Sequence, residues 1–160
     1  MTDEVGRYLK KAEHALEVAE DLLKGGHAPD GASKIYYAMY YAAQALLKAN
    51  GIDVVKYSAV ESAFGYYFAK PGRIDSKFHR MLMNARKIRE IADYDIDEEI
   101  VEPVASLKID EGRAFLLAMK VYRYLTQDIK GYCSISCKHF IGTVSVPSFF
   151  MPSYLVIGHS

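Results

Sequence analysis

The sequence predicts an all-α protein: an antiparallel up-and-down bundle of four long helices and one short helix, followed by an irregular C-terminal tail. Apolar residues recur every three or four positions through most of the first 130 residues, which is the periodicity of helices with one buried face. Short connections rich in Gly, Pro, Asn and Asp separate these segments. No alternating strand pattern interrupts them before about residue 131. We therefore expect a helical bundle at residues 1–130 and a separate tail at residues 131–160.

The composition is that of a globular chain without an overall charge. Its 160 residues are enough for one core with a small appendage, and 20 Lys and Arg balance 20 Asp and Glu. Attraction to nucleic acid or to a membrane would therefore depend on local patches. The first residues lack the apolar region of a secretory signal, and two cysteines are too few for a disulfide framework. We expect a cytoplasmic protein.

The first two helices are predicted over residues 2–24 and from Pro29-Asp30 to Asn50-Gly51. In the first, apolar residues alternate at spacings of four and three, and Gly25-Gly26 ends the pattern. The second is apolar or aromatic around almost its whole circumference. A helix of this kind requires burial on most of its sides.

Four tyrosines form a ladder along the second helix: Tyr36, Tyr37, Tyr40 and Tyr41. A buried tyrosine ring favours a position where its hydroxyl group is wet or hydrogen-bonded, so such a ladder belongs most often to a core or a subunit interface. Because the helix has more apolar surface than one bundle can cover, we assign the four tyrosines to the interface of a homodimer. Stacking of nucleic-acid bases on these rings is the alternative.

Three further helices follow. A short helix is predicted over residues 57–69, with the inward side chains Val60, Phe64 and either Tyr67 or Phe68. Asp75 caps a long helix, whose core stripe is Phe78, Leu82, Ala85, Ile88 and Ala92. A connection containing Pro103 leads to a last helix, capped by Asp110 and ending near Lys130. Its apolar side consists of Ala114, Leu117, Ala118, Val121 and Leu125.

The tail differs in composition from the rest of the chain. Residues 131–160 contain one charged side chain, Lys138, and their Ser, Gly, Val, Ile and Phe content is typical of short extended pieces. The uncharged run 140–157 has the length of a membrane span, but its two prolines and several serines argue against a spanning helix. Cys133, Cys137 and His139 lack a fourth ligand and the usual spacing. We expect no membrane association, no metal and no cofactor.

Reactive side chains are most concentrated towards the end of the helix that begins after Asp75. A basic run without a carboxylate before Glu90 comprises Lys77, His79, Arg80, Arg86, Lys87 and Arg89. Arg89 and Asp93, four residues apart, share one helix face, and Tyr94 lies beside them. This cluster beside a basic surface indicates an anionic ligand such as a phosphate. The alternative is a solvated ion pair, although its order is the less favoured one and the helix dipole disfavours an anion at Asp93.

Three segments, taken together, carry a family resemblance. They are residues 32–43, with the run Tyr36-Tyr37-Ala38; residues 56–65; and residues 85–94, which end in Arg89-x-x-Ala92-Asp93-Tyr94. In this order they resemble the HEPN family (higher eukaryotes and prokaryotes nucleotide-binding domain), and its small stand-alone prokaryotic branch in particular. The resemblance covers roughly residues 3–128. It implies a dimeric helical bundle in which two copies of a polar motif share one cleft. Many members are metal-independent ribonuclease toxins, neutralised by a small nucleotidyltransferase.

The resemblance also implies roles for individual residues. Arg89 matches the arginine of the family motif, but the histidine expected after four to six intervening residues is absent, because Tyr94, Asp95 and Ile96 occupy those positions. We therefore take Arg89 and Asp93 as candidate catalytic residues. The candidate nucleotide- or RNA-binding residues are Arg80, Arg86, Lys87 and Tyr94. Tyr94 is also the candidate for a tyrosine that the partner modifies with AMP.

The missing histidine leaves two functions open. Cleavage of RNA by its 2′-hydroxyl group requires an acid and a base that work near neutral pH, which histidine supplies. The ordinary pKa of an aspartate, about 3.9, makes Asp93 a poor acid unless a second Asp93 across a dimer raises that pKa. One reading is a toxin-like protein that binds RNA or nucleotide in a dimer cleft and cleaves RNA without metal. The other is a non-catalytic module that dimerises and docks a nucleotidyltransferase.

Overall fold

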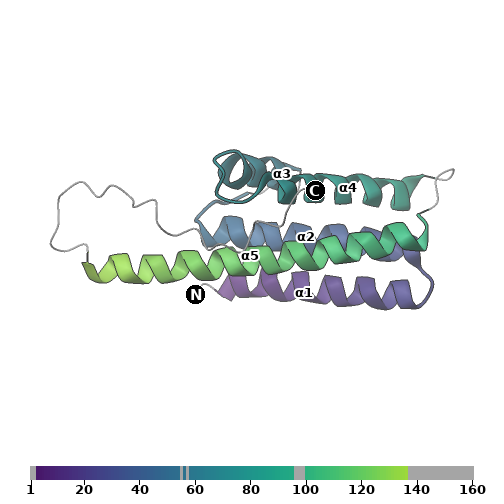
Figure 1. The fold of residues 1–160 in the computed structure, drawn as a ribbon, viewed down its shortest axis with the longest axis horizontal. Coiled ribbons are helices and arrows are strands. Elements are labelled where there is room, and N and C mark those ends of the chain that lie inside the picture. The colour runs from purple at the N-terminus through teal and green to yellow at the C-terminus, as the bar shows by residue number, and fades with distance from the viewer. Residues whose placement is uncertain (1–2, 55, 57, 96–99, 137–160) are drawn as a thin grey trace, which may run out of the picture. The chain divides into compact units, whose positions relative to one another are not determined.

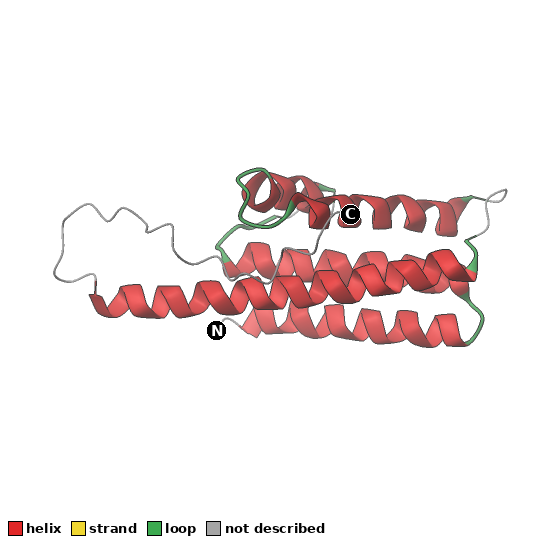
Figure 2. Cartoon of the chain, in the orientation of Figure 1, coloured by secondary structure: helices red, strands yellow, loops and turns green. Residues whose placement is uncertain are grey.

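The structure, a computed structural model, describes residues 3–54, 56, 58–95 and 100–136 (Figure 1). All regular structure in those ranges is helical (Figure 2), which confirms the predicted all-α class. The chain divides into two compact units, Met1–Gln127 and Asp128–Ser160. Side chains are described only within the first unit. The predicted domain boundary at residue 130 stays a prediction, and Lys138, His139 and the uncharged run 140–157 lie outside the described residues.

Helices α1 (Asp3–Lys24) and α2 (Ala28–Ala49) form an antiparallel pair with bounds close to those predicted (Figure 1). The turn between them requires a glycine, because Gly26 has a φ of 81°, a left-handed backbone conformation that other residues rarely adopt. The backbone N–H of His27 donates to the carbonyl group of Leu22 at 2.8 Å and closes the end of α1. As its composition requires, α2 is buried along most of its length.

The predicted short helix consists of two pieces, α3 (Ala59–Phe64) and the π-helical turn η1 (Gly65–Ala69). The N–H of Lys70 donates to the carbonyl group of Gly65 at 2.8 Å, five residues earlier, which is the hydrogen bond of a π-helix. Val60, Phe64 and Phe68 are fully buried, whereas Tyr67 is exposed. Of the two alternatives for the third inward side chain, the structure therefore places Phe68 in the core.

Helix α4 (Ser76–Tyr94) has the predicted cap and the predicted core stripe. The Asp75 carboxylate accepts a hydrogen bond from the N–H of Lys77 at 2.8 Å. Leu82 and Ala85 are fully buried, and Phe78 packs partly buried against the same core. Near the end of α4, Ile88 and Ala92 pack against a smaller cluster that includes Ala28 and Ala32 of α2. These contacts hold the Arg89 segment against α2.

Helix α5 (Glu102–Ser136) begins earlier than predicted. Pro103 belongs to its first turn and not to a connecting loop, because the first backbone N–H groups of a helix have no intrahelical partner and proline loses nothing there. Asp110 is therefore an interior residue that pairs with Arg113 at 2.8 Å and not the cap of the helix. Residues 131–136, expected to be irregular, continue the helix.

The apolar side predicted for the last helix is not its buried face. Leu117, Val121 and Leu125 are exposed, whereas the core side of α5 consists of Ala105, Ile109, Phe115, Leu116 and Met119. The ring of Phe115 lies 5.6 Å from that of Phe64 and 6.0 Å from that of Phe78. Because α5 carries apolar residues on more than one side, its periodicity alone does not identify the face that meets the core.

Figure 1 shows α1, α2, α4 and α5 running in alternating directions, as expected for an up-and-down bundle. The main core is centred on α2, from Ile35 to Leu47, against which buried residues of the other helices pack. Among the described residues, no helix is long and apolar enough to cross a bilayer.

Candidate functional site

Arg89 lies where α4 faces α2, and its guanidinium group is surrounded by tyrosine rings. The central carbon of this group is 5.8 Å from the ring centres of Tyr36 and Tyr37 on α2 and 5.7 Å from that of Tyr94. Such distances allow the cation to interact with all three aromatic rings. The Arg89 side chain is 22% exposed, so it is held by the protein but still reachable from solvent.

Asp93 connects Arg89 to α2. Its carboxylate accepts from Nε of Arg89 at 2.9 Å and from the Ser33 hydroxyl group at 2.8 Å, and Nη2 of Arg89 donates to the Tyr94 hydroxyl group at 3.3 Å. Burial by itself lowers the pKa of the Arg89 guanidinium group, but the nearby Tyr37 and Asp93 raise it above its ordinary value. Arg89 is therefore a permanent cation with a fixed orientation.

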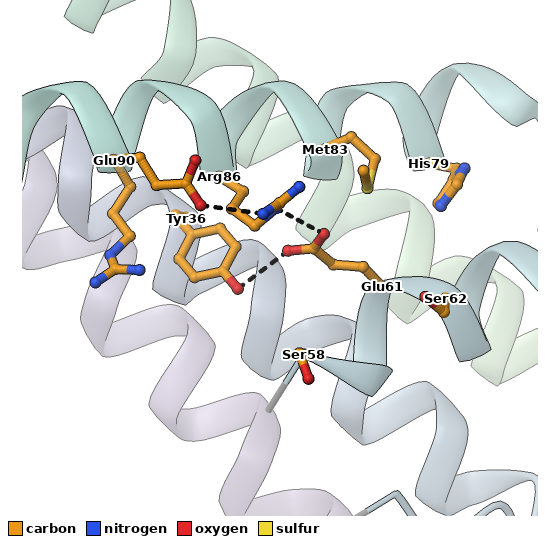
Figure 3. A pocket seen from close by; sticks show the side chains of 9 residues that line it. Tyr36, Ser58, Glu61, Ser62, His79, Met83, Arg86 and Glu90 are labelled. Atoms are coloured by element: carbon orange, nitrogen blue, oxygen red, sulfur yellow. Dashed lines mark hydrogen bonds and ion pairs between the residues drawn. The ribbon is translucent and has the colours of Figure 1, made fainter. Parts of the chain in front are cut away.

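A cavity of about 480 Å³ opens beside Arg89 between α2, α3 and α4 (Figure 3). This volume lies within the range of small-molecule sites. One end is lined by Glu90, and the other by His79 and Ser62, and Arg89, next to Glu90 on α4, also lines the cavity. The remaining lining residues are Tyr36, Ser58, Glu61, Met83 and Arg86.

A buried carboxylate organises the centre of this cavity. The Glu61 side chain is 7% exposed and accepts a hydrogen bond from the Tyr36 hydroxyl group at 3.1 Å. Nε of Arg86 lies 3.0 Å from Glu61, as an ion pair that lacks hydrogen-bond alignment, and Nη1 of Arg86 pairs with Glu90 at 3.0 Å. Burial, followed by the charge of Glu61, raises the pKa of the Tyr36 phenol. Arg86, predicted to bind nucleotide, is thus compensated by two carboxylates.

His79 lies at the far end of the cavity from Glu90 (Figure 3). Its ring packs on Gly65, where a Cβ atom would lie only 2.7 Å from Nε2 of His79, and its centre is 6.4 Å from that of Phe64. Ten residues separate His79 from Arg89, which is about 15 Å along a helix axis. The two side chains of one chain therefore cannot contact the same phosphate group.

The structure separates two other predicted residues from this site. Arg80 and Lys87 are exposed and do not line the cavity. Nine helical residues, at 3.6 residues per turn, place Arg80 on the side of α4 opposite Arg89, and Lys87 lies nearly as far around the helix. Tyr94, by contrast, is 73% exposed and lies directly beside Arg89.

The four ladder tyrosines of α2 fall into two pairs. Tyr36 and Tyr40 are buried within a single chain, and the hydroxyl group of Tyr40 accepts from the Gln44 amide at 3.1 Å. Tyr37 and Tyr41 keep accessible surface, beneath the side chains of Lys34 and Lys11 respectively. The assignment of all four to a homodimer interface stays a prediction.

Sequence reasoning missed the roles of Glu61, His79 and Ser33. A signal for His79 was present, because His79, Met83, Arg86 and Glu90 recur at helical spacing and mark a second polar face of α4. Glu61 and Ser33 gave no comparable signal, since their partners lie 25 and 60 residues away in the chain. Within the part of the chain that the structure describes, no group of three His, Cys, Asp or Glu could hold a metal ion.

Comparison with known proteins places the chain in a family. The model of the HEPN domain matches residues 5–127. A Methanocaldococcus jannaschii protein named "Putative toxin MJ0142" is 32% identical over 128 residues, which are 80% of this chain and 87% of that protein.

Two further relatives have a similar degree of identity to this chain. A second protein of Methanocaldococcus jannaschii, named "Putative toxin MJ0605", is 29% identical over 118 residues, which are 74% of this chain and 87% of that protein. A Pyrococcus horikoshii protein named "UPF0332 protein PH1297" is 32% identical over 105 residues, or 66% of this chain and 74% of that protein. The fold, the matched residues and these relatives together establish that the chain belongs to the HEPN domain family.

Proposed function

We propose that the protein is a toxin-like, cytoplasmic RNA-binding protein that holds a phosphate group of RNA or of a nucleotide at Arg89. The observation that carries this proposal is that Arg89 lines a cavity of about 480 Å³ and is held there by Asp93 and three tyrosine rings. A guanidinium group carries five N–H donors in a planar fork that suits phosphate oxygens. Asp93 and Tyr94 engage two of its nitrogens, which leaves donors for a ligand.

Tyr94 supplies a surface for a base or for a modification. Its ring is 73% exposed, and base stacking on a tyrosine contributes about 1–3 kcal/mol. The same exposure makes its hydroxyl group accessible to a partner nucleotidyltransferase. Transfer of AMP from ATP would join the Tyr94 oxygen to the α-phosphorus, with release of pyrophosphate and the phenolic proton. The new phosphate would then lie beside Arg89 and block the site.

A homodimer would give this site its second half. Two copies joined along the α2 and α4 faces would bring a second Arg89 and Asp93 to the same groove, with Tyr37 and Tyr41 at the contact. Within one chain, both oxygens of the Asp93 carboxylate are engaged, one by the Ser33 hydroxyl group and the other by Nε of Arg89. These contacts support a positioning role for Asp93 and binding in preference to cleavage.

The test of the proposal is RNA binding by Arg89→Ala, measured by fluorescence anisotropy with a labelled dinucleotide in the presence of EDTA. We expect at least a tenfold loss of affinity, because a charge-assisted hydrogen bond contributes about 1.5–3 kcal/mol. Arg80→Ala, on the opposite side of the same helix, is the matched control and should bind as the wild type does. Equal binding by Arg89→Ala and wild type would refute the proposal.

A cleavage assay with the same two proteins separates the two functions that the sequence left open. Incubation of wild type with RNA and EDTA, followed by gel electrophoresis, detects metal-independent cleavage. Products that disappear in Arg89→Ala would establish the ribonuclease. Binding without products would favour the non-catalytic module, for which a co-purifying nucleotidyltransferase, or an AMP-sized mass increase on Tyr94, is the confirming observation.

A further inference from the structure

A second hollow is lined by residues that follow Gly65 in the chain. Gly65, against which His79 packs, is the first residue of η1, and the next two residues are Tyr66 and Tyr67. These tyrosines line a separate hollow of about 480 Å³ together with Lys70, Pro71 and Arg73. None of these five lining residues takes part in the Arg89 site.

Both tyrosines of this hollow are exposed. Tyr66 is 64% and Tyr67 41% exposed, and their rings meet edge to face, with centres 5.0 Å apart at 87°. An edge-to-face pair leaves ring faces open to solvent. Two adjacent exposed rings are unusual on a bundle whose other α3–η1 aromatics, Phe64 and Phe68, are fully buried.

The charge of the hollow is positive and uncompensated. Among the residues that line it, Lys70 and Arg73 are basic and none is acidic. In the described part of the chain, neither of these two forms an ion pair, whereas Arg86 and Arg89 each pair with carboxylates. Nζ of Lys70 lies 5.9 Å from the centre of the Tyr66 ring, so cation and ring share one surface.

The backbone beneath the hollow is firmly held. Gly72 has a φ of 74°, which turns the chain sharply after η1. Ile74, which is buried, donates its N–H to the carbonyl group of Phe68 at 3.1 Å. Lys70 and Arg73 therefore project from a closed turn anchored in the core, so little backbone freedom is lost when a ligand binds.

We propose that this hollow, formed by Tyr66, Tyr67, Lys70 and Arg73, binds single-stranded RNA, with bases stacked on the two tyrosines and phosphates at the two cations. Exposed aromatic rings interleaved with cations are the elements by which proteins bind unpaired nucleic acid without sequence preference. The proposal rests on the proposed function, because it gives the RNA that binds at Arg89 a second contact surface on the same chain. The hollow thus extends the RNA-binding surface beyond a single nucleotide.

The experiment compares a labelled dinucleotide with a labelled single-stranded RNA of roughly 15 nucleotides, within the usual range of such sites. Tyr66→Ala should weaken binding of the long RNA about fivefold or more and leave dinucleotide binding unchanged, because it removes the ring on which one base stacks. Tyr66→Phe should retain most of the affinity. Tyr124→Ala is the matched control, because Tyr124 on α5 is 68% exposed and lies outside both surfaces. Circular dichroism checks that each variant folds.

The contribution of the two cations is measured separately, by the salt dependence of RNA binding. Arg73→Gln should reduce the slope of log K against log salt for the long RNA by about 0.7, the value for one neutralised phosphate on a single strand. The proposal would be overturned if Arg73→Gln had the salt slope of the wild type and Tyr66→Ala had its affinity for the long RNA.

Failure of this proposal and failure of the proposed function give different results. If Arg89→Ala loses affinity for both RNAs and Tyr66→Ala for neither, the hollow is not an RNA site and the Arg89 site stands. If Tyr66→Ala loses affinity for the long RNA and Arg89→Ala for neither, the hollow stands alone and the proposed function falls. Absence of RNA binding by the wild type would remove both proposals. Displacement of the long RNA from the hollow by an acidic peptide at equal concentration would remove the hollow as an RNA site and leave the Arg89 site untouched.

Discussion

Arg89 is held more firmly than an arginine on an isolated helix. An Arg–Asp pair four residues apart contributes only about 0.2–0.5 kcal/mol on a helix surface, and the helix dipole disfavours Asp93 where it lies. The Ser33 hydroxyl group, which donates to Asp93 at 2.8 Å from another helix, offsets this disadvantage. Asp93 therefore occupies a locally unfavourable position because a contact from α2 stabilises its carboxylate, which in turn orients Arg89.

Tyr36 makes the stability of the fold sensitive to alkaline pH. Its phenol has a pKa raised above the ordinary 10.0 by burial and by Glu61, so the unfolded chain loses this proton first as the pH rises. The stabilisation is fully present below about pH 10 and is lost as the pH rises towards the folded-state pKa. We expect Tyr36 to lower the free energy of unfolding by up to about 1.4 kcal/mol per pH unit above pH 10.

Urea unfolding of wild type and Tyr36→Phe on both sides of the ordinary phenol pKa of 10.0 measures this effect. The variant should be less stable at neutral pH by about 1–3 kcal/mol, because Glu61 loses its buried donor, and its stability should fall less steeply in alkali. Tyr40, whose pKa is also raised, affects both proteins alike. Identical alkaline slopes would show that Tyr36 ionises equally in both states.

Gly65→Ala tests the packing of His79 at the end of the cavity. A Cβ atom at this position would lie 2.7 Å from Nε2 of His79, and the Phe64 ring packs nearby. We expect a destabilisation of about 1–3 kcal/mol from this overpacking, although alanine otherwise favours helices. In a His79→Ala background most of that loss should disappear, as a double-mutant cycle by urea unfolding would measure. Additive losses would mean that the ring does not contact Gly65.

At the scale of the helices, α5 departs most from the sequence prediction. The exposed residues Leu117, Val121 and Leu125 have the spacing of a core stripe. The residues that enter the core, among them Leu116 and Met119, lie on a neighbouring face of the same helix. Which stripe faces inward depends on the rings of Phe64 and Phe78, which receive Phe115. These rings belong to α3 and α4, so residues of α5 alone do not define its buried face.

Neighbouring leucines of α5 provide a direct test of its orientation. Leu116 is buried and Leu117 is exposed. Leu116→Ala should lower the free energy of unfolding by about 2–5 kcal/mol, whereas Leu117→Ala should change it by less than about 0.5 kcal/mol. Urea denaturation of the two variants at low protein concentration makes the comparison. A larger loss for Leu117→Ala than for Leu116→Ala would reverse the assignment of the two faces.

At the scale of the bundle, the candidate site exists only where α2, α3 and α4 meet. The sequence predicted Arg89, Asp93 and Tyr94 as a cluster, because they are near one another in the chain and on one helix end. It did not predict Glu61, which comes from another helix and engages both Tyr36 and Arg86. It also grouped Arg80 and Lys87 with Arg89, although helix geometry turns them to the other side of α4.

The sequence by itself determined the all-α class, the positions of α1, α2 and α4, the cap at Asp75 and the Arg89–Asp93 pair. These features depend on residues within a few positions of one another, so their spacing and capping chemistry can be recognised in the sequence. The tertiary structure alone decided the buried face of α5, the contact of Ser33 with Asp93 and the cavity between Arg89 and His79. Those features depend on packing between residues far apart in the chain, which no local periodicity encodes.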